Sequence, residues 1–485
     1  MTDVAILRQA LIESLPSVDH AGAEPDREPA FTYVPPSHAK ALDPDVSLVE
    51  GIRGAGKSFW WAQLASERHR DAIVKAFPEI RVGSGVKVVK AFGAQASSVD
   101  APSQDVLASL AANYPPRAIW KAVLAQKAGL GEGFPSTEDW PQRVAWVVQQ
   151  PEAFDRALLR VDEACEQRGE TLVVLFDALD RLAADWQHIR PLAKGLLQVA
   201  LELRSTKCIR FKLFMRPDML QDKEIMQFPD ASKLLARKAA LTWRRVDLYA
   251  LLFQCLANAP SGGAEFRWLC EEELACEWRQ INGLWQLPTA LRVDEKEQER
   301  VFARLAGSAM ASGPSGYKRG KPYTWLVNHL QDGLDQVSPR SFSAALLHAA
   351  EDTRDDAGLV LDYKAIQSGV REASKIRVNE LITEDYPWVD LVMQPLRGNL
   401  TVPCTEDDIK RLWADARTLE GLEMDLGRSS HDVKLPPPSL EPDAVLGSLE
   451  GLGLLTRMDR GRIQMPDVYR LAFGLGRRGG VKPLK

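Results

Sequence analysis

The chain has few cysteines, and none of them forms a pair at a spacing typical of a disulfide framework or a zinc site. The six lie at positions 165, 208, 255, 270, 276 and 404, with no Cys-x-x-Cys pair and no histidine at ligand spacing. This pattern is typical of reduced, buried thiols in a cytoplasmic protein. No apolar run approaches the roughly 20 residues that span a bilayer, so no membrane partner is expected. The amino terminus lacks a basic stretch before an apolar one, and no signal peptide is predicted.

The chain also lacks a strong excess of charge of either sign. It carries 61 Lys and Arg against 66 Asp and Glu, a net charge of −5. A protein that coats nucleic acid with its whole surface would be basic, so this composition excludes that class while leaving room for a local basic patch. The length of 485 residues, with 45% hydrophobic and 26% charged residues, is typical of a globular protein of about two or three domains.

From residue 46 onward, short apolar strands alternate with helical segments, a pattern typical of a parallel α/β sheet. The run at 172–176 is apolar throughout, as expected of a central strand buried on both faces. Strands are predicted at 47–50, 86–92, 172–176, 209–215 and 240–243, and helices at 59–76, 102–149, 182–204 and 246–256. The region 262–365 reads as helical, and Ser338 followed by Pro339 predicts the start of a helix there.

Residues 51–58 form the most informative segment, because they match the pattern Gly-x4-Gly-Lys-Ser. A strand precedes them and a helix follows, which is the context that a phosphate-binding P-loop requires. Glycines allow the backbone to wrap closely around phosphate oxygens. Lys57 is predicted to neutralise the β and γ oxygens of ATP, and Ser58 to ligate Mg²⁺. The residues predicted to bind the nucleotide are Gly51, Gly54, Gly56, Lys57, Ser58 and Phe59.

Two carboxylates follow the apolar run at 172–176, where a P-loop protein needs an acid for its metal. Asp177 is predicted to hold Mg²⁺ through water, and Asp180 to orient or deprotonate an attacking water. A plain helix cap is the alternative role for Asp180.

The run from Asp177 to Leu182, Asp-Ala-Leu-Asp-Arg-Leu, resembles the second nucleotide motif of the STAND, NACHT and KAP branches of ATPases, which are related to AAA+ enzymes. These branches often place a second acid three positions after the first, as Asp180 stands here. The sequence departs from standard AAA+ enzymes at Ala178, where those carry a glutamate. The resemblance therefore fits a slow ATPase switch as well as it fits a motor.

Two arginines acquire predicted roles through this resemblance. In the resembling families an arginine at the end of the next strand senses the γ-phosphate, and Arg216 stands at that place. Pro339-Arg340 resembles an element that opens a lid helix in KAP and origin-recognition ATPases, where the arginine reaches the phosphates. The alternative for Arg216 is an ordinary surface arginine before Pro217, and the alternative for Arg340 is a solvated position at the start of a helix. Residues 31–36 correspond to a segment that wraps over adenine in these families, and a packing linker explains them equally well.

These signals together predict an α/β protein with a P-loop NTPase core built on a parallel sheet, a helical lid and a C-terminal winged-helix domain. The winged helix is inferred because a helix at 444–452 leads into an alternating segment around an Asp-Arg-Gly turn, which is typical of a hairpin. The predicted limits are 1–45 for an N-terminal segment, 46–260 for the core, 261–365 for the lid and 366–485 for the winged helix with its basic tail.

The last 29 residues carry eight basic and two acidic side chains, an excess that is local to this end of the chain. Arg457, Arg460 and Arg462 on the predicted hairpin are candidates for phosphate contacts with DNA. Docking of the winged helix onto protein is the alternative.

The sequence is compatible with three functions. The first is an ATP-dependent switch that engages DNA or a partner protein through its winged helix. The second is a STAND-type signalling or assembly ATPase of a bacterial antiviral defence system, which would form homo-oligomers and work with a separate effector chain; this context rests on the resemblance alone. A small-molecule kinase fits least, because a mobile-lid arginine cluster is missing.

Overall fold

The computed structural model describes residues 3–16, 29–93, 100–131, 133–137, 139–313, 315–428, 436–437 and 439–477. The chain forms two compact units. The first, the sheet unit, runs from Val34 to Thr242. The second, the helical unit, comprises Ala30–Tyr33, the chain from Trp243 onward and the amino-terminal helix. Within the ranges given above, no helix is both long and apolar enough to cross a membrane.

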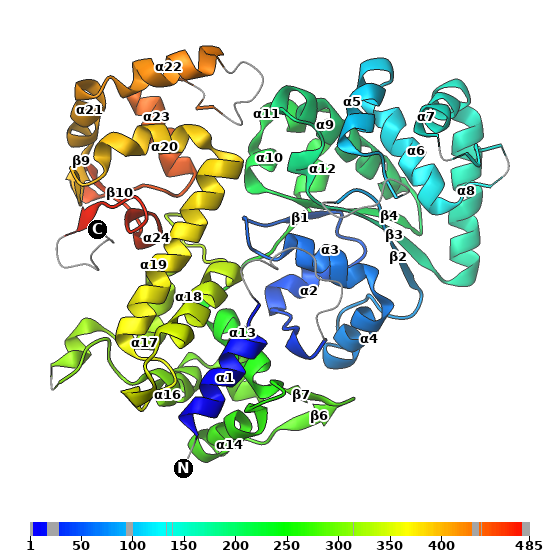
Figure 1. Ribbon diagram of the computed structural model, residues 1–485. Helices are drawn as coiled ribbons and strands as arrows, with labels where there is room; N and C mark the ends of the chain where they lie inside the picture. The colour runs from blue at the N-terminus through cyan, green and yellow to red at the C-terminus, as the bar shows by residue number, and fades with distance from the viewer. Residues whose placement is uncertain are drawn as a thin grey trace. The chain divides into compact units, whose positions relative to one another are not determined.

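The sheet unit is built on five parallel strands, which confirms the predicted fold class (Figure 1). Their order across the sheet is β2-β3-β4-β1-β5, so β4 separates β1 from β3. The strands β3 and β4 are almost entirely buried because apolar side chains cover both of their faces. The strands are β1 (Leu48–Glu50), β2 (Val86–Lys90), β3 (Thr171–Phe176), β4 (Ile209–Met215) and β5 (Ala239–Ala240).

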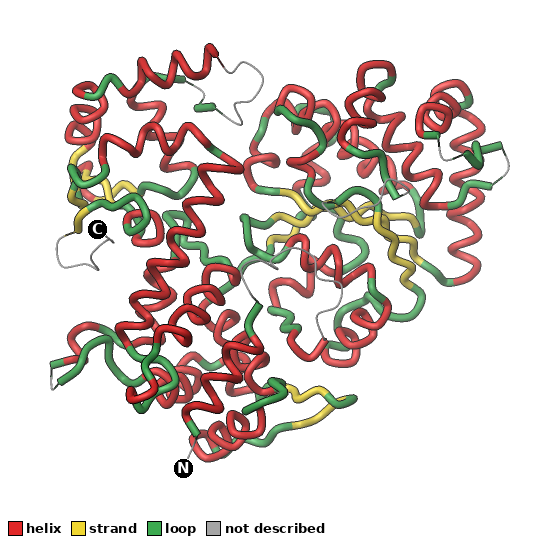
Figure 2. Tube along the Cα trace, viewed as in Figure 1, coloured by secondary structure: helices red, strands yellow, loops and turns green. Residues whose placement is uncertain are grey.

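Helices cover both faces of this sheet, as the tube in Figure 2 also shows. One face carries α2 (Pro36–Leu42), α3 (Lys57–Ala65) and α4 (Glu67–Ala76). The other carries α5 (Gln104–Asn113), α6 (Pro116–Ala128), α7 (Trp140–Gln149), α8 (Pro151–Arg168) and α9 (Trp186–Glu202), followed by the short α10 (Pro217–Gln221), α11 (Lys223–Met226) and α12 (Ala231–Leu235). The single helix predicted over 59–76 is wrong: Ser66 has an extended backbone, with φ −91° and ψ 120°, and separates α3 from α4.

One strand carries a buried lysine where an apolar side chain is expected. Lys212 of β4 is 1% exposed, and its Nζ donates to the carbonyl oxygens of Ala41 at 2.8 Å, Asp43 at 2.9 Å and Val46 at 2.7 Å. Burial lowers the pKa of Lys212 to about 7, although Asp43 opposes this shift. The lysine therefore fastens the end of α2 and the loop before β1 to the centre of the sheet.

Replacement of Lys212 by Met keeps the apolar stem of the side chain but removes the ammonium that donates to three carbonyl groups, two of them in buried hydrogen bonds. We expect the free energy of unfolding to fall by about 2–4 kcal/mol, measured by urea denaturation. Lys233→Met provides the control, because Lys233 is more than half exposed and forms an exposed ion pair with Asp230; its loss should stay below about 1 kcal/mol. Equal losses in the two variants would show that Lys212 does not anchor the loop.

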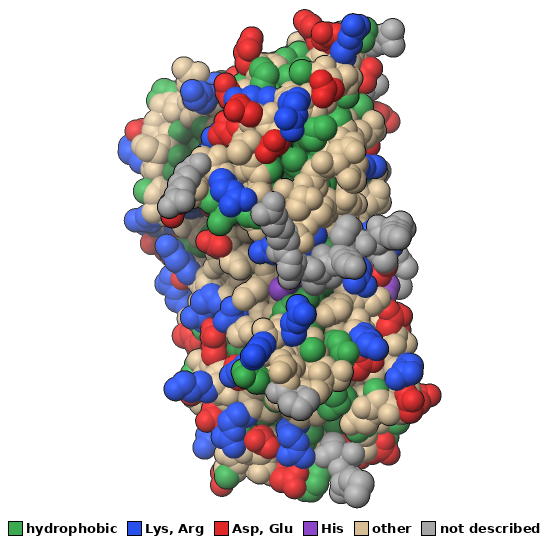
Figure 3. Space-filling model, turned by 90° about the vertical axis from the view of Figure 1, so that its left-hand side faces the viewer, with side chains coloured by type: hydrophobic (Ala, Val, Ile, Leu, Met, Phe, Trp, Pro, Cys, Tyr) green, Lys and Arg blue, Asp and Glu red, His purple; other side chains and the backbone are tan. Residues whose placement is uncertain are grey.

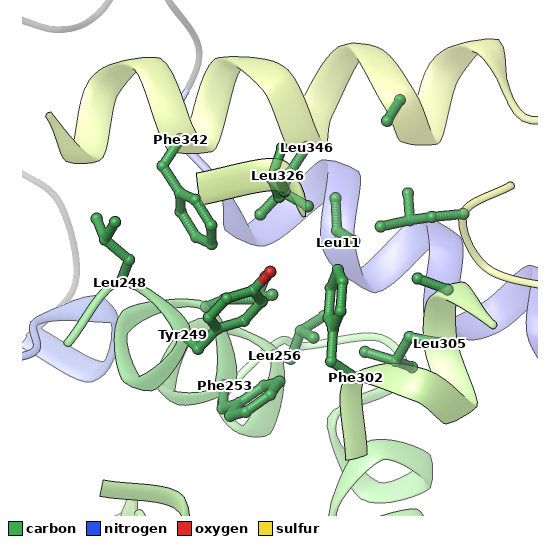
Figure 4. Close-up of a cluster of buried hydrophobic side chains, with 14 of the residues drawn as sticks. Leu11, Leu248, Tyr249, Phe253, Leu256, Phe302, Leu305, Leu326, Phe342 and Leu346 are labelled. Atoms are coloured by element: carbon green, nitrogen blue, oxygen red, sulfur yellow. The ribbon is translucent and has the colours of Figure 1, made fainter. Parts of the chain in front are cut away.

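The helical unit has a core in which aromatic rings from several helices meet (Figure 4). Tyr249 of α13 lies 4.8 Å from Phe302, 5.2 Å from Phe342 and 4.1 Å from Tyr323 between ring centroids. Its hydroxyl donates to the Tyr323 carbonyl at 2.8 Å, so the polar end of the ring is satisfied. The helices are α1 (Val4–Ser14), α13 (Arg245–Ala257), α14 (Gly263–Leu274), α15 (Thr289–Val293), α16 (Glu295–Ala306), α17 (Pro322–Leu330), α18 (Pro339–Asp352) and α19 (Tyr363–Glu380).

Three predictions from the sequence concern this unit. The helix expected from Ser338 is confirmed: its hydroxyl accepts from the Ser341 amide at 3.1 Å, and α18 begins at Pro339. The wholly helical reading of 262–365 is wrong, because β6 (Arg279–Ile281) and β7 (Leu284–Gln286) form an antiparallel hairpin. The predicted core limit of 260 stays a prediction, although α13 packs in the helical unit.

The carboxyl-terminal part of the helical unit has a second core, which α19 also enters with Val378. Here β10, β11 and β9 form an antiparallel sheet in that order, and the hairpin expected near 456–465 is present. The sequence predicts an irregular loop over 425–442, which contains Pro436, Pro437 and Pro438, but α22 (Thr418–Arg428) continues into this range. The elements are α20 (Pro387–Met393), β8 (Thr401–Val402), β9 (Cys404–Thr405), α21 (Glu406–Asp415), α22 (Thr418–Arg428), α23 (Pro442–Gly451), β10 (Thr456–Met458), β11 (Arg462–Gln464), α24 (Asp467–Arg470) and β12 (Gly476–Arg477).

Candidate nucleotide-binding site

Residues 51–58 connect the end of β1 to the start of α3. Gly54 and Gly56 have φ of 75° and 103°, a region that side chains other than glycine rarely adopt. At Gly51 a Cβ atom would lie 3.2 Å from Lys57 Cγ, so the loop closes tightly on its own lysine. Amide groups in the first turn of a helix have no acceptor within that helix, and they attract anions. The loop and the start of α3 therefore have the geometry of a phosphate cradle.

The lysine of the loop is held by the loop itself. Lys57 Nζ donates to the carbonyl oxygens of Gly51 at 2.9 Å and Ile52 at 3.0 Å. Burial lowers the pKa of Lys57 to about 8, against the opposing charge of Asp177. The ammonium is thus a partly desolvated charge that gains from an incoming phosphate more than an exposed lysine would.

Asp177 follows the last residue of β3 and reaches the phosphate loop. Its Oδ2 accepts from the Ser58 hydroxyl at 2.5 Å, and the residue is 1% exposed. Its other oxygen, Oδ1, is buried and has no hydrogen-bond partner among the described residues. Burial raises the pKa of Asp177, and the Ser58 hydrogen bond and Lys57 oppose this shift. An unpartnered carboxylate oxygen beside a serine hydroxyl fits Mg²⁺, which prefers oxygen ligands.

Asp180 and Arg216 meet at the same edge of the sheet. Arg216 follows β4, and its Nη1 lies 3.4 Å from Asp180 Oδ2. The arginine also makes two shorter hydrogen bonds to Asp218, from Nε at 3.1 Å and from Nη2 at 2.8 Å. Burial would raise the pKa of Asp180, but the charges of Arg216, Lys57 and Arg53 outweigh it and hold that pKa below its usual range. Asp180 is therefore an ionised carboxylate within a group of cations.

The strand order explains why residues far apart in the sequence meet here. In a parallel sheet the carboxyl ends of all strands lie at one edge. Because β4 lies between β1 and β3, Arg216 is placed between the phosphate loop and Asp177. Asp218 and Arg53 were missed from the sequence. Their only signal is nearness to predicted site residues, since Asp218 stands two positions after Arg216 and Arg53 lies within the loop.

A buried histidine that no sequence pattern indicates contacts α3 through Trp60. His38 of α2 is fully buried, and its Nδ1 accepts from Trp60 Nε1 at 3.1 Å. Burial lowers the pKa of His38 to about 3, although a hydrogen bond with the Thr242 backbone opposes this shift. The imidazole is therefore neutral at ordinary pH, and it links α2 to the helix that carries Lys57 and Ser58.

This buried histidine predicts a loss of stability in acid. The pKa of His38 is lower in the folded chain than in the unfolded one, so between pH 6.5 and about 3 the unfolded state binds more protons. As the pH falls through this window, the free energy of unfolding should decrease by up to about 1.4 kcal/mol per pH unit. Asparagine keeps an acceptor near the Nδ1 position, and His38→Asn should lack this slope in denaturation measured from pH 7.5 to 5. Parallel slopes for the two proteins would contradict the assignment.

The structure also gives the surroundings of Phe59 and Arg340 within their own units. Phe59 is half-buried, and its ring packs edge-on against Trp60 at 5.1 Å between centroids. Arg340 lies in the helical unit, where its Nη1 donates to Glu380 at 2.5 Å. Its predicted contact with phosphate stays a prediction.

The arginines predicted on the hairpin have partners within the fold. Arg457 forms ion pairs with Glu406 and Glu450. Arg462 donates to the Pro403 carbonyl at 2.7 Å. The side chain of Arg460 lies outside the described residues. The local excess of positive charge counted along the sequence is therefore partly compensated by acids from other elements.

The chain shows low similarity to known proteins. No protein-family model matches the chain, and no curated protein matches it significantly. The ORC2 protein of Aeropyrum pernix, solved in ADPNP–ADP complexes, is 16% identical, with 92% of this chain and 96% of that chain covered and a TM-score of 0.39. Cdc6p of Pyrobaculum aerophilum is 10% identical, with 92% and 93% covered and a TM-score of 0.32. Similarity this low transfers no function.

Proposed function

We propose that this protein is a P-loop ATPase that binds ATP with Mg²⁺, hydrolyses it slowly and acts as a nucleotide-dependent switch. The observation that carries the proposal is the Ser58–Asp177 hydrogen bond beside the phosphate loop, with Asp177 Oδ1 left open. A Gly-rich turn with no ligand would not require a buried carboxylate at this place, since burying an incompletely satisfied charge costs free energy.

Each side chain of the site has a role in this reaction. Lys57 and the first-turn amides of α3 hold the β- and γ-phosphates. Mg²⁺, when bound by Ser58 and Asp177, neutralises phosphate charge. Asp180 takes a proton from the attacking water, whose oxygen bonds to the γ-phosphorus. The bond from that phosphorus to the bridging oxygen breaks, and ADP leaves with the electron pair while Arg216 compensates the charge of the γ-phosphate.

Slow turnover is expected because the residue after Asp177 is an alanine. Ala178 offers no carboxylate, and it adopts the left-handed region at φ 53° before the short turn Leu179–Arg181. The candidate base is therefore Asp180, whose pKa the charges of Arg216, Lys57 and Arg53 hold below its usual range. A carboxylate held by cations has a low pKa and is a weak proton acceptor.

The partner of the switch is proposed to engage the carboxyl-terminal part of the helical unit. The order α20, β9, α21, α23, β10, β11, with an antiparallel sheet, supports reading this part as a winged helix. The pairing of Arg457 with two glutamates favours a protein partner over DNA. On the face drawn in Figure 3, basic and acidic side chains are interspersed, which is not the pattern of a nucleic-acid track.

Two substitutions test the nucleotide site. Lys57→Ala should abolish binding of a fluorescent ATP analogue, because the phosphates lose their buried cation. Asp180→Asn should retain nucleotide binding and lower the rate of phosphate release by about 10²–10⁴-fold, the usual contribution of a general base. Glu224→Gln, a surface change in the same unit, serves as the control. Full turnover in Asp180→Asn would remove Asp180 from catalysis.

DNA binding is tested by its dependence on salt. If the hairpin contacts phosphates, Arg462→Ala should reduce the slope of log K against log salt by about 0.9, and Arg457→Ala by less because Glu406 and Glu450 already compensate it. The protein-partner proposal expects no salt-dependent DNA binding for any of the three proteins, measured by fluorescence anisotropy. Assembly into oligomers with an ATP analogue, followed by light scattering, would favour the STAND-type alternative.

A further inference from the structure

Arg216 touches two carboxylates in unequal ways. Toward Asp218 it presents the Nε–Nη2 edge of the guanidinium, with hydrogen bonds of 3.1 and 2.8 Å to the two carboxylate oxygens. Toward Asp180 it presents Nη1, at 3.4 Å from Oδ2. A two-point pair between an arginine and a carboxylate is stronger and more directional than a single long contact. Asp218 is therefore the fixed partner of Arg216, and Asp180 the exchangeable one.

Asp218 is itself held in place. It lies in the first turn of α10, directly after Pro217, whose ring restricts the backbone. Its Oδ1 also accepts from the Met219 amide at 3.1 Å. The side chains of Arg216 and Asp218 are 12% and 18% exposed, so water screens their interaction only in part. The guanidinium is thus oriented from one side and presents Nη1 on the other.

The Asp180 carboxylate, which contacts Arg216 Nη1, carries a negative charge, as a phosphate does. Asp180 lies near enough to Arg216, Lys57 and Arg53 for all three to stabilise its ionised form. These are the cations that a triphosphate at the loop would also approach. Without nucleotide, Asp180 is the anion that they share.

We propose that Asp218 is a positioning residue that keeps Arg216 at the catalytic edge, and that Arg216 Nη1 exchanges Asp180 for the γ-phosphate when ATP binds. The proposal rests on the proposed function. A γ-phosphate carries more negative charge than a carboxylate, so it competes well for the long contact at Nη1, whereas the two-point pair with Asp218 persists. ADP has no γ-phosphate and leaves the Arg216–Asp180 contact in place. The exchange therefore distinguishes ATP from ADP and frees Asp180 to act on water.

The first test separates turnover from binding. Asp218→Asn keeps the shape of the side chain but removes its charge, and Asp218→Ala removes the pair. We expect kcat for ATP to fall by about 10–100-fold in Asp218→Ala and by less in Asp218→Asn, with the Kd for ADP changed by less than about twofold. Asp222→Ala is the matched control, because Asp222 pairs with Arg190 in the same unit at 2.8 Å but does not contact the site; it should leave kcat unchanged.

The second test is a double-mutant cycle with Arg216→Ala. If Asp218 acts through Arg216, then Asp218→Ala should cause no further loss of kcat in the Arg216→Ala background. Additive losses, or an equal loss in Asp222→Ala, would overturn the positioning role. Asp218→Asn keeps this test available if Asp218→Ala does not fold.

The third test addresses the exchange. Asp180→Asn removes the competing anion, so it should tighten binding of a non-hydrolysable ATP analogue relative to ADP by about 5–20-fold, a range typical of coupling between sites. Equal changes for the two nucleotides would overturn the exchange. Failure of the unaltered protein to bind either nucleotide would instead overturn the proposed function, so the two failures are distinguishable.

Discussion

The hydrogen bond from Ser58 to Asp177 joins two segments that are 119 positions apart in the chain. It connects the first turn of α3 to the residue after β3, and it passes the end of β4, which lies between β1 and β3. The phosphate loop, the proposed metal position and Arg216 all depend on this arrangement. If β3 were displaced by one strand, Asp177 would no longer reach Ser58, and the loop would be a Gly-rich turn without an acid.

The site balances its charges before any nucleotide enters. Lys57, Arg53 and Arg216 face Asp177, Asp180 and Asp218, which influence one another through burial and proximity. Burial alone disfavours each charge, so the groups are stable only as a set. A ligand that brings negative charge must rearrange this set, which is the physical basis of the proposed switch.

In the helical unit, packed aromatic rings and ion pairs connect the elements. Its first core is a cluster of rings around Tyr249, and α19 extends from this core into the second one with Val378. Ion pairs also tie its carboxyl-terminal elements together: Arg457 joins the hairpin to Glu406 of α21 and Glu450 of α23. The hairpin is therefore connected through Arg457 to two helices.

The sequence alone determined the elements that depend on local patterns. The phosphate loop was recognised because its glycines and lysine are consecutive, the strand at 172–176 because its apolar run is unbroken, and the start of α18 because Ser338 and Pro339 act on the adjoining backbone. Only the tertiary structure decided which distant groups meet. Lys212 is buried because carbonyl groups from another segment receive its ammonium, and Asp218 matters because the backbone turns it toward Arg216. The charge of Arg457, counted as available from the sequence, is compensated by acids 51 and 7 positions away. Hydrogen bonds and ion pairs of this kind depend on distances in space, which local sequence patterns do not encode.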